Sequence, residues 1–185
     1  MNKKYEFIRK NITNTLYKIR ALRSFGDVKK GDLGGWIASE DNLSHEGKCW
    51  VYDNAQVFGD AKIYDNAKVY RDTRVFGKAK VFEDAQIYGN AEVWETAKVY
   101  IYGYSMTENA MIYDNAQSYG HDEICGRIRV YDRAQICGDA YIGTNKTAYI
   151  CGNSKIDHGV WTQLADIGGK RYLISNTLEK ILVRK

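Results

Sequence analysis

The sequence contains no proline among its 185 residues. Proline lacks the backbone N–H that a ladder of hydrogen bonds between strands requires, so its absence favours a chain of stacked strands. Long apolar runs are missing as well: no stretch approaches the roughly 18 residues of a membrane span. The first residues, Met1-Asn2-Lys3-Lys4, also lack the apolar segment of a secretory signal. We therefore expect a cytoplasmic protein without membrane contact.

Residues that hold metals or form disulfides are few. The three histidines and four cysteines show no metal-ligand spacing, and no C-x-x-C pair occurs. We expect no metal site and no bound cofactor, and we interpret the cysteines as small packing residues. The formal charge is +4, with acids and bases interleaved along the chain. This balance permits contact with nucleic acid but does not favour it.

A repeat of six residues fills the stretch from Cys49 to Tyr100. In each repeat one residue is small, a branched aliphatic residue follows two positions later, and an aromatic residue comes next. The following pair is rich in Gly, Asp and Asn. The small positions are Ala55, Ala61, Ala67, Thr73, Ala79, Ala85, Ala91 and Ala97. The aliphatic positions are Val57, Ile63, Val69, Val75, Val81, Ile87, Val93 and Val99.

This pattern predicts an all-β parallel β-helix. Residues two apart lie on the same face of a strand, so the small and aliphatic positions face a common core. Gly, Asp and Asn tolerate the left-handed backbone angles of a corner. A short strand followed by a corner in every repeat must coil on itself, with three repeats, or about 18 residues, in each coil. An amphipathic helix would need a period near 3.6 and is excluded.

The repeat also resembles a known family. Val57–Lys62 (V-F-G-D-A-K) and Ile63–Lys68 (I-Y-D-N-A-K) resemble the hexapeptide repeat of the left-handed β-helix superfamily, the trimeric LpxA-like proteins. The segment Leu16–Ile37 resembles the YdcK-like branch of uncharacterised bacterial and phage proteins. The resemblance implies a left-handed coil. It also implies kinship with coenzyme-A-dependent acyltransferases, which use a histidine as general base and assemble as trimers.

Three segments are expected along the chain: an N-terminal β cap (1–35), a left-handed β-helix (36–163) and a C-terminal cap or hairpin (164–185). Strand-like alternation marks Lys4–Arg9 and Thr15–Phe25 in the first cap. Arg171–Ser175 and Lys180–Arg184 are expected to pair as a hairpin in the second. Both caps are needed because the ends of a β-helix expose unpaired strand edges.

The repeat continues beyond Tyr100 with two interruptions. One extra residue enters within Ile101–Asn109, and two more enter near Thr144–Thr147. Insertions this small fit at corners without breaking the coil, and they form no long projecting loop. The last small positions are expected at Ala148, Ser154 and Val160.

Outward aromatic residues should form columns along the coil. Tyr and Trp are enriched at interfaces, so such a column predicts a surface for a partner or for self-association. The alternative is that stacked rings only stabilise the coil, by about 0.5–1.5 kcal/mol per pair. The predicted binding column is Phe58, Phe76, Trp94, Tyr113 and Tyr131. Two further columns hold Tyr64, Phe82, Tyr100, Tyr119 and Cys137, and Tyr52, Tyr70, Tyr88 and Cys125.

No catalytic residue is assigned. His121 and His158 are the candidates for a general base, because each lies at a corner beside an aspartate. Without a long loop or a transferase motif around them, we expect a non-enzymatic, rigid binding or assembly module. The resemblance implies that it is phage or prophage encoded. It would bind a protein partner or self-associate as a trimer or dimer. The alternative is a coenzyme-A-dependent acyltransferase; nucleic-acid binding through Lys62, Lys80, Lys98 and Lys155 is disfavoured by acidic corners nearby.

Overall fold

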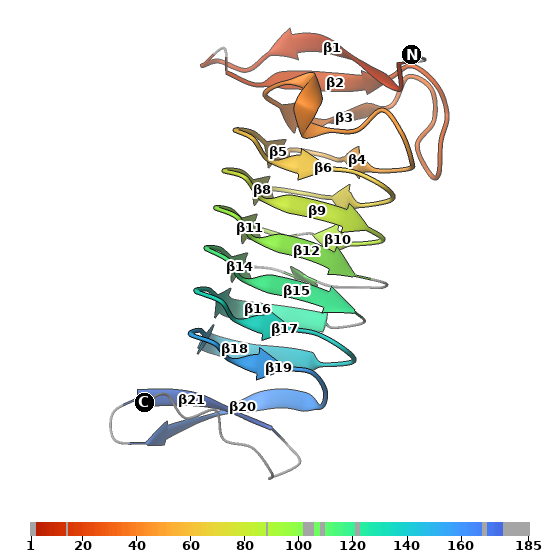
Figure 1. Ribbon diagram of the computed structural model, residues 1–185. Coiled ribbons are helices and arrows are strands. Elements are labelled where there is room, and N and C mark those ends of the chain that lie inside the picture. The colour runs from red at the N-terminus through yellow and green to blue at the C-terminus, as the bar shows by residue number, and fades with distance from the viewer. Residues whose placement is uncertain are drawn as a thin grey trace.

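The computed structural model describes residues 3–13, 15–87, 89–101, 106–107, 110–120, 123–167 and 170–175. These residues form a parallel β-helix with antiparallel strands at both ends (Figure 1). In Figure 1 the front strands run to the right, the chain returns behind them, and each coil lies below the last, so the coil is left-handed. The described part holds a single 3-10 turn, η1 (Glu40–Asn42), and no helix in it is long and apolar enough to cross a membrane.

The coil has three faces, each a stack of short strands. The front face holds β6 (Lys62–Ile63), β9 (Lys80–Glu83), β12 (Lys98–Ile101), β15 (Gln117–Gly120), β17 (Gln135–Ile136) and β19 (Lys155–Ile156). A second face holds β3 (Leu33–Ile37), β5 (Gln56–Val57), β8 (Arg74–Val75), β11 (Glu92–Val93) and β14 (Met111–Ile112). The third face holds β4 (Trp50–Val51), β7 (Lys68–Val69), β10 (Gln86–Ile87) and β13 (Met106–Thr107).

The strand pairing confirms the predicted repeat length. Lys62 pairs with Lys80, and Lys80 pairs with Lys98, so successive coils are 18 residues apart. The interval grows to 19 where Glu92 pairs with Met111. Two long strands, β16 (Glu123–Val130) and β18 (Tyr141–Ile150), wrap around the corner between the second and third faces. Between them the register shifts by two residues, where the sequence predicted two insertions.

The core consists of the residues that the pattern assigned to it. The small and aliphatic positions from Ala55 to Val99 are buried, each 0–1% exposed. Their outward neighbours are half-buried or exposed, as a period of two requires. Thr73 occupies one small position, and its buried hydroxyl has no hydrogen-bond partner among the described residues. Of the cysteines, Cys49 and Cys137 are buried and Cys151 is half-buried; all three are free thiols.

The corners are closed by residues with left-handed backbone angles. Asp65 and Asp114 adopt φ values of 57° and 58°, which aspartate tolerates better than most residues. Their carboxylates also accept hydrogen bonds from the coil that follows: Asp65 from the N–H of Glu83 at 3.3 Å, and Asp114 from the N–H of Asp132 at 3.2 Å. Each corner is therefore fixed both by its own chain and by the next coil.

The N-terminal cap is a small antiparallel sheet that lies on the first coil (Figure 1). Strands β1 (Tyr5–Lys10) and β2 (Tyr17–Ala21) form a hairpin, and β2 pairs antiparallel with β3. The other edge of β3 pairs parallel with β5. Strand β3 thus joins cap to coil, and the cap covers the first edge of the helix.

The C-terminal end differs from the prediction in one detail. Strand β21 (Lys170–Ser175) pairs antiparallel with β20 (Val160–Ile167). The predicted pairing with Lys180–Arg184 lies outside the described residues and stays a prediction. Val160 is 43% exposed, while Trp161 is 5% exposed and pairs with Ile142. The large indole, rather than a small residue, therefore ends the core. The domain boundaries proposed from the sequence stay a prediction, and β20 runs across the one at 163.

Candidate functional site

The predicted aromatic column forms a continuous ladder of five rings, which we call the aromatic ladder: Phe58, Phe76, Trp94, Tyr113 and Tyr131. Successive ring centroids lie 5.0, 5.7, 4.7 and 5.2 Å apart, and the planes differ by 18° or less. Every ring is half-buried. Neighbouring rings cover one another's faces, so the surface presents a line of ring edges to solvent.

The ladder follows directly from the strand pattern. Each ring comes one residue after an inward aliphatic residue, at the end of a strand on the second face. The strand spacing of about 4.8 Å is close to the distance at which aromatic rings stack. The sequence therefore placed these residues correctly, and whether the ladder binds a partner stays a prediction.

A charged pair lies beside the upper part of the aromatic ladder. The guanidinium carbon of Arg74 is 5.5 Å from the ring centroids of both Phe58 and Phe76, within range of a cation–π interaction. Arg74 also donates to Glu92 at 3.2 Å. The indole N–H of Trp94 is buried and has no hydrogen-bond partner within the described residues. Arginine and tryptophan on one surface are typical of residues that dominate binding energy at interfaces.

The other two columns are only partly described. Tyr64 stacks on Phe82 at 4.8 Å, and Tyr52 stacks on Tyr70 at 4.3 Å. Tyr88 and the side chains of Tyr100, Tyr119 and Cys125 lie outside the described part of the chain. Cys137, assigned to an outward column, is 4% exposed. We therefore treat the aromatic ladder as the main candidate surface.

A groove adjoins the first ring of the aromatic ladder. Residues of the turn between β1 and β2 lie close to the outer face of β3, β5 and β8. Two adjoining hollows of about 580 and 490 Å³ lie between the turn and this face. The first is lined by Arg9, Lys10, Asn11, Ile12, Thr13, Leu16, Trp36, Asn54, Gln56 and Asp72. The second is lined by Asn11, Thr13, Thr15, Leu16, Ala38, Gln56, Phe58, Gly59 and Arg74. Both hollows are wide open to solvent, so they form a shallow surface groove rather than an enclosed pocket.

Of the two catalytic candidates, only His158 is within the described residues; His121 lies outside them. Its ring nitrogen Nδ1 lies 2.6 Å from a carboxylate oxygen of Asp157, and its side chain is 71% exposed. The aspartate therefore does orient the imidazole, although neighbours at a corner commonly point apart. The pair lies at the C-terminal end of the coil, whereas both hollows lie at the N-terminal end.

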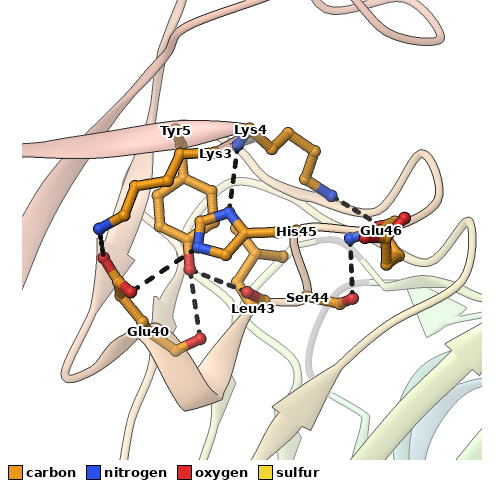
Figure 2. A network of polar contacts seen from close by, with 8 residues as sticks. All are labelled: Lys3, Lys4, Tyr5, Glu40, Leu43, Ser44, His45 and Glu46. Atoms are coloured by element: carbon orange, nitrogen blue, oxygen red, sulfur yellow. Dashed lines mark hydrogen bonds and ion pairs between the residues drawn. The ribbon is translucent and has the colours of Figure 1, made fainter. Parts of the chain in front are cut away.

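The third histidine, His45, belongs to the junction between cap and coil (Figure 2). Its Nδ1 accepts a hydrogen bond from the backbone N–H of Lys4 at 3.2 Å, so the ring proton is assigned to Nε2. Nε2 lies 3.8 Å from Glu40, and the ring stacks on Tyr5 at 4.4 Å. Burial lowers the pKa of His45, although Glu40 opposes this effect. With Nδ1 occupied, His45 is placed to hold the cap rather than to remove a proton.

A buried lysine completes the same junction. Lys4 is fully buried, and its ammonium group donates to the backbone oxygens of Glu46 and Cys49 at 3.1 and 2.9 Å and contacts the Cys49 sulfur at 3.2 Å. Burial lowers the pKa of Lys4 and raises the pKa of the Cys49 thiol, and each group partly opposes the shift of the other. The three contacts satisfy the three N–H groups of a lysine. Sequence reasoning missed this pair, because nothing in the repeat relates the two residues.

Comparison with known proteins gives one partial match. No model of a known protein family matches the chain. The chain is 51% identical over 45 residues to a protein of Escherichia coli (strain K12) named "Uncharacterized acetyltransferase YdcK". The matched segment covers 24% of this chain and 14% of that protein. The expected resemblance to YdcK-like hexapeptide-repeat proteins is therefore confirmed, over a segment that spans about one seventh of the relative.

Proposed function

We propose that the protein is a rigid, non-enzymatic binding module whose aromatic ladder engages another protein chain in the cytoplasm. The observation that carries the proposal is the unbroken line of five stacked rings on one face. Contiguous aromatic strips mark contact sites more often than single exposed rings do. Because the coil already fixes the rings, little side-chain freedom is lost on binding. A phage or prophage origin belongs to the same proposal and is supported by the sequence resemblance alone.

The test replaces two central rings with lysine. The double variant Phe76→Lys/Trp94→Lys should keep its circular dichroism spectrum and lose partner capture from a lysate of the native host. Removal of such anchors costs about 2 kcal/mol or more, roughly a thirtyfold loss of affinity. Lys62→Ala/Lys80→Ala on the front face is the matched control. Light scattering on the same proteins decides whether the captured partner is a second copy of this chain. Unchanged capture and unchanged mass in a folded double variant would leave the ladder a structural feature.

A second candidate is a coenzyme-A-dependent acyltransferase, with coenzyme A as the cofactor. It is supported by the name of the YdcK relative and by the Asp157–His158 pair, whose exposed imidazole is oriented by a carboxylate. We expect no turnover of acetyl-coenzyme A and no rise in melting temperature on adding coenzyme A. Saturable binding that is lost in His158→Ala or His121→Ala would favour the enzyme.

A further inference from the structure

The groove beside the β1–β2 turn has an ordered wall and a positively charged rim, and neither feature belongs to the aromatic ladder. The described residues of the turn hold one another. The Asn11 side-chain oxygen accepts from the N–H groups of Thr15 and Leu16 at 2.8 and 3.1 Å, and its amide donates to Thr13 at 2.9 Å. Both hollows share Asn11, Thr13, Leu16 and Gln56, so they are two ends of one groove.

The rim of the groove carries unpaired positive charge. Arg9 and Lys10 are exposed, and neither forms an ion pair with any described residue. Arg9 lies 5.6 Å from the ring of Trp36, which lines the groove. Lys10 lies 5.2 Å from the ring of Tyr17, with which it pairs on the other face of the cap sheet. The guanidinium group of Arg9 is therefore available to a ligand in the groove. The single acidic residue in the lining, Asp72, is already contacted by Asn54 at 3.4 Å. An anionic ligand complements this charge.

The shape of the groove favours an extended chain. Its floor follows β5 and the corners on both sides, from Asn54 to Gly59. The extended part of this floor lies between the corners at Asp53 and Gly59, so it holds about four residues, or roughly 13 Å at 3.3 Å each, and suits a short extended segment of a ligand peptide. The amide side chain of Gln56 lies in the middle of the floor and makes no hydrogen bond within the described structure. An amide that is free in this position matches the donor and acceptor of a peptide bond.

We infer that this groove receives an extended acidic peptide segment of the protein partner, an inference that rests on the proposed binding function. An acidic side chain of the peptide lies against Arg9, and Lys10 adds positive charge nearby. An apolar or aromatic side chain at the other end meets Phe58, where the groove opens onto the aromatic ladder. Ile12, fully exposed on the rim at 102%, adds an apolar contact.

The test selects hexapeptides from a random phage-displayed library on the wild-type protein. We expect the selected peptides to be acidic and to include an aromatic or aliphatic residue. A labelled copy of a selected peptide should bind Arg9→Glu/Lys10→Glu roughly tenfold or more weakly in fluorescence anisotropy. Its affinity should also fall as salt rises. The control Lys29→Glu/Lys30→Glu makes the same charge change at two exposed residues outside the groove and should bind as wild type does.

Three outcomes would overturn the inference: no peptide is enriched, the enriched peptides are not acidic, or both charge-reversal variants bind them equally. Circular dichroism confirms that the variants are folded, and Gln56→Leu tests the groove floor without a change of charge. The ladder variant Phe76→Lys/Trp94→Lys separates this result from the proposed function. If it loses partner capture while no acidic peptide is selected, the groove inference fails and the binding module stands.

Discussion

At the scale of single residues, a few buried polar atoms lack hydrogen-bond partners within the described part of the chain. Burying a hydroxyl or an N–H without a partner costs about 1–3 kcal/mol. Four such groups lie among the described residues: Arg23 Nε, His45 Nε2, the Thr73 hydroxyl and the Trp94 indole N–H, of which the last two belong to the repeat. Thr73 stands where the neighbouring repeats carry alanine, so only its methyl group suits the core. The buried Thr73 hydroxyl therefore lowers the free energy of unfolding, and a substitution can remove it.

Replacing Thr73 with valine should stabilise the protein. Valine keeps the branched shape and removes the unpaired hydroxyl, so Thr73→Val should raise the free energy of unfolding by about 1 kcal/mol. Urea denaturation measures the change. Thr96→Val is the matched control: the exposed Thr96 hydroxyl bonds to the Asp114 backbone oxygen at 2.7 Å, and its loss should lower stability by about 0.5–1 kcal/mol. The prediction fails if Thr73→Val is less stable than wild type.

His45 should make the stability of the cap depend on pH. Burial holds its pKa below the ordinary value of 6.5. Above pH 6.5 the imidazole is neutral in both the folded and the unfolded state, and its contribution to stability is complete. Below that pH the unfolded chain binds the proton first, so stability is lost as the pH falls toward the folded pKa. In the neutral ring, Nδ1 accepts the Lys4 N–H. When the ring is protonated, Nδ1 carries a proton of its own and this hydrogen bond is lost.

His45→Asn removes this titration while keeping an acceptor for the Lys4 N–H. Melting temperatures of wild type and variant should be compared between about pH 7.5 and pH 5, the range in which histidine changes charge. We expect the wild type to lose more stability than the variant over this range. Equal losses would show that the imidazole does not titrate at the junction.

At the scale of elements, the corners decide how closely the coils stack. Glycines at positive φ occupy several corners, and their surroundings differ. At Gly138, with φ of 72°, an added Cβ would lie 2.1 Å from the Asp157 backbone oxygen in the next coil. At Gly152, with φ of 68°, it would meet nothing within 4 Å. The corner at Gly138 is thus constrained both by its backbone angle and by the neighbouring coil, whereas the corner at Gly152 is constrained by its backbone angle alone.

Alanine at these two glycines should separate the two constraints. Gly152→Ala should cost about 1–2 kcal/mol, the strain of a left-handed angle in a residue with a Cβ. Gly138→Ala should cost clearly more, because the Asp157 corner must also move. Chemical denaturation of both variants measures the difference. Equal costs would mean that the coils separate freely at this corner.

At the scale of the whole molecule, the N-terminal cap covers one strand edge and one large apolar ring of the coil. The cap strand β2 covers the edge of β3, and the cap residues Tyr5 and Phe25 pack their rings against Trp50, which is 1% exposed. The cap also joins the coil through Lys4 and His45. Without it, an unpaired strand edge and a large apolar ring would face solvent.

A variant that lacks residues 1–32 should therefore self-associate. We expect light scattering to show species larger than the full-length protein at the same concentration, with the β-sheet spectrum retained or increased. Ile12→Lys is the control, since it removes the exposed side chain of the hairpin without uncovering an edge. A truncated protein with the full-length mass and melting temperature would show that the cap is not needed to protect the coil.

The sequence alone determined the coil, its register, its core and the aromatic ladder. These features follow from short-range rules: alternation along a strand and turn chemistry at each corner, repeated until the coils stack. The 18-residue interval then places Phe58, Phe76 and Trp94 in one line with no knowledge of the tertiary structure. Among the described residues the expected burial fails at three positions: Cys137, expected outward, is buried, Ser154 is half-buried, and at Val160 the repeat ends and Trp161 takes the core position.

Only the tertiary structure decided how the cap joins the coil. Lys4 meets Cys49 across 45 positions of sequence, and its N–H meets His45 across 41. No period links such residues, so no local rule pairs them. The groove likewise arises where the β1–β2 turn hangs over Gln56 and Phe58, and the Asp157–His158 contact depends on side-chain rotamers. Periodicity fixes what repeats, whereas unique contacts between distant segments depend on how the folded chain packs.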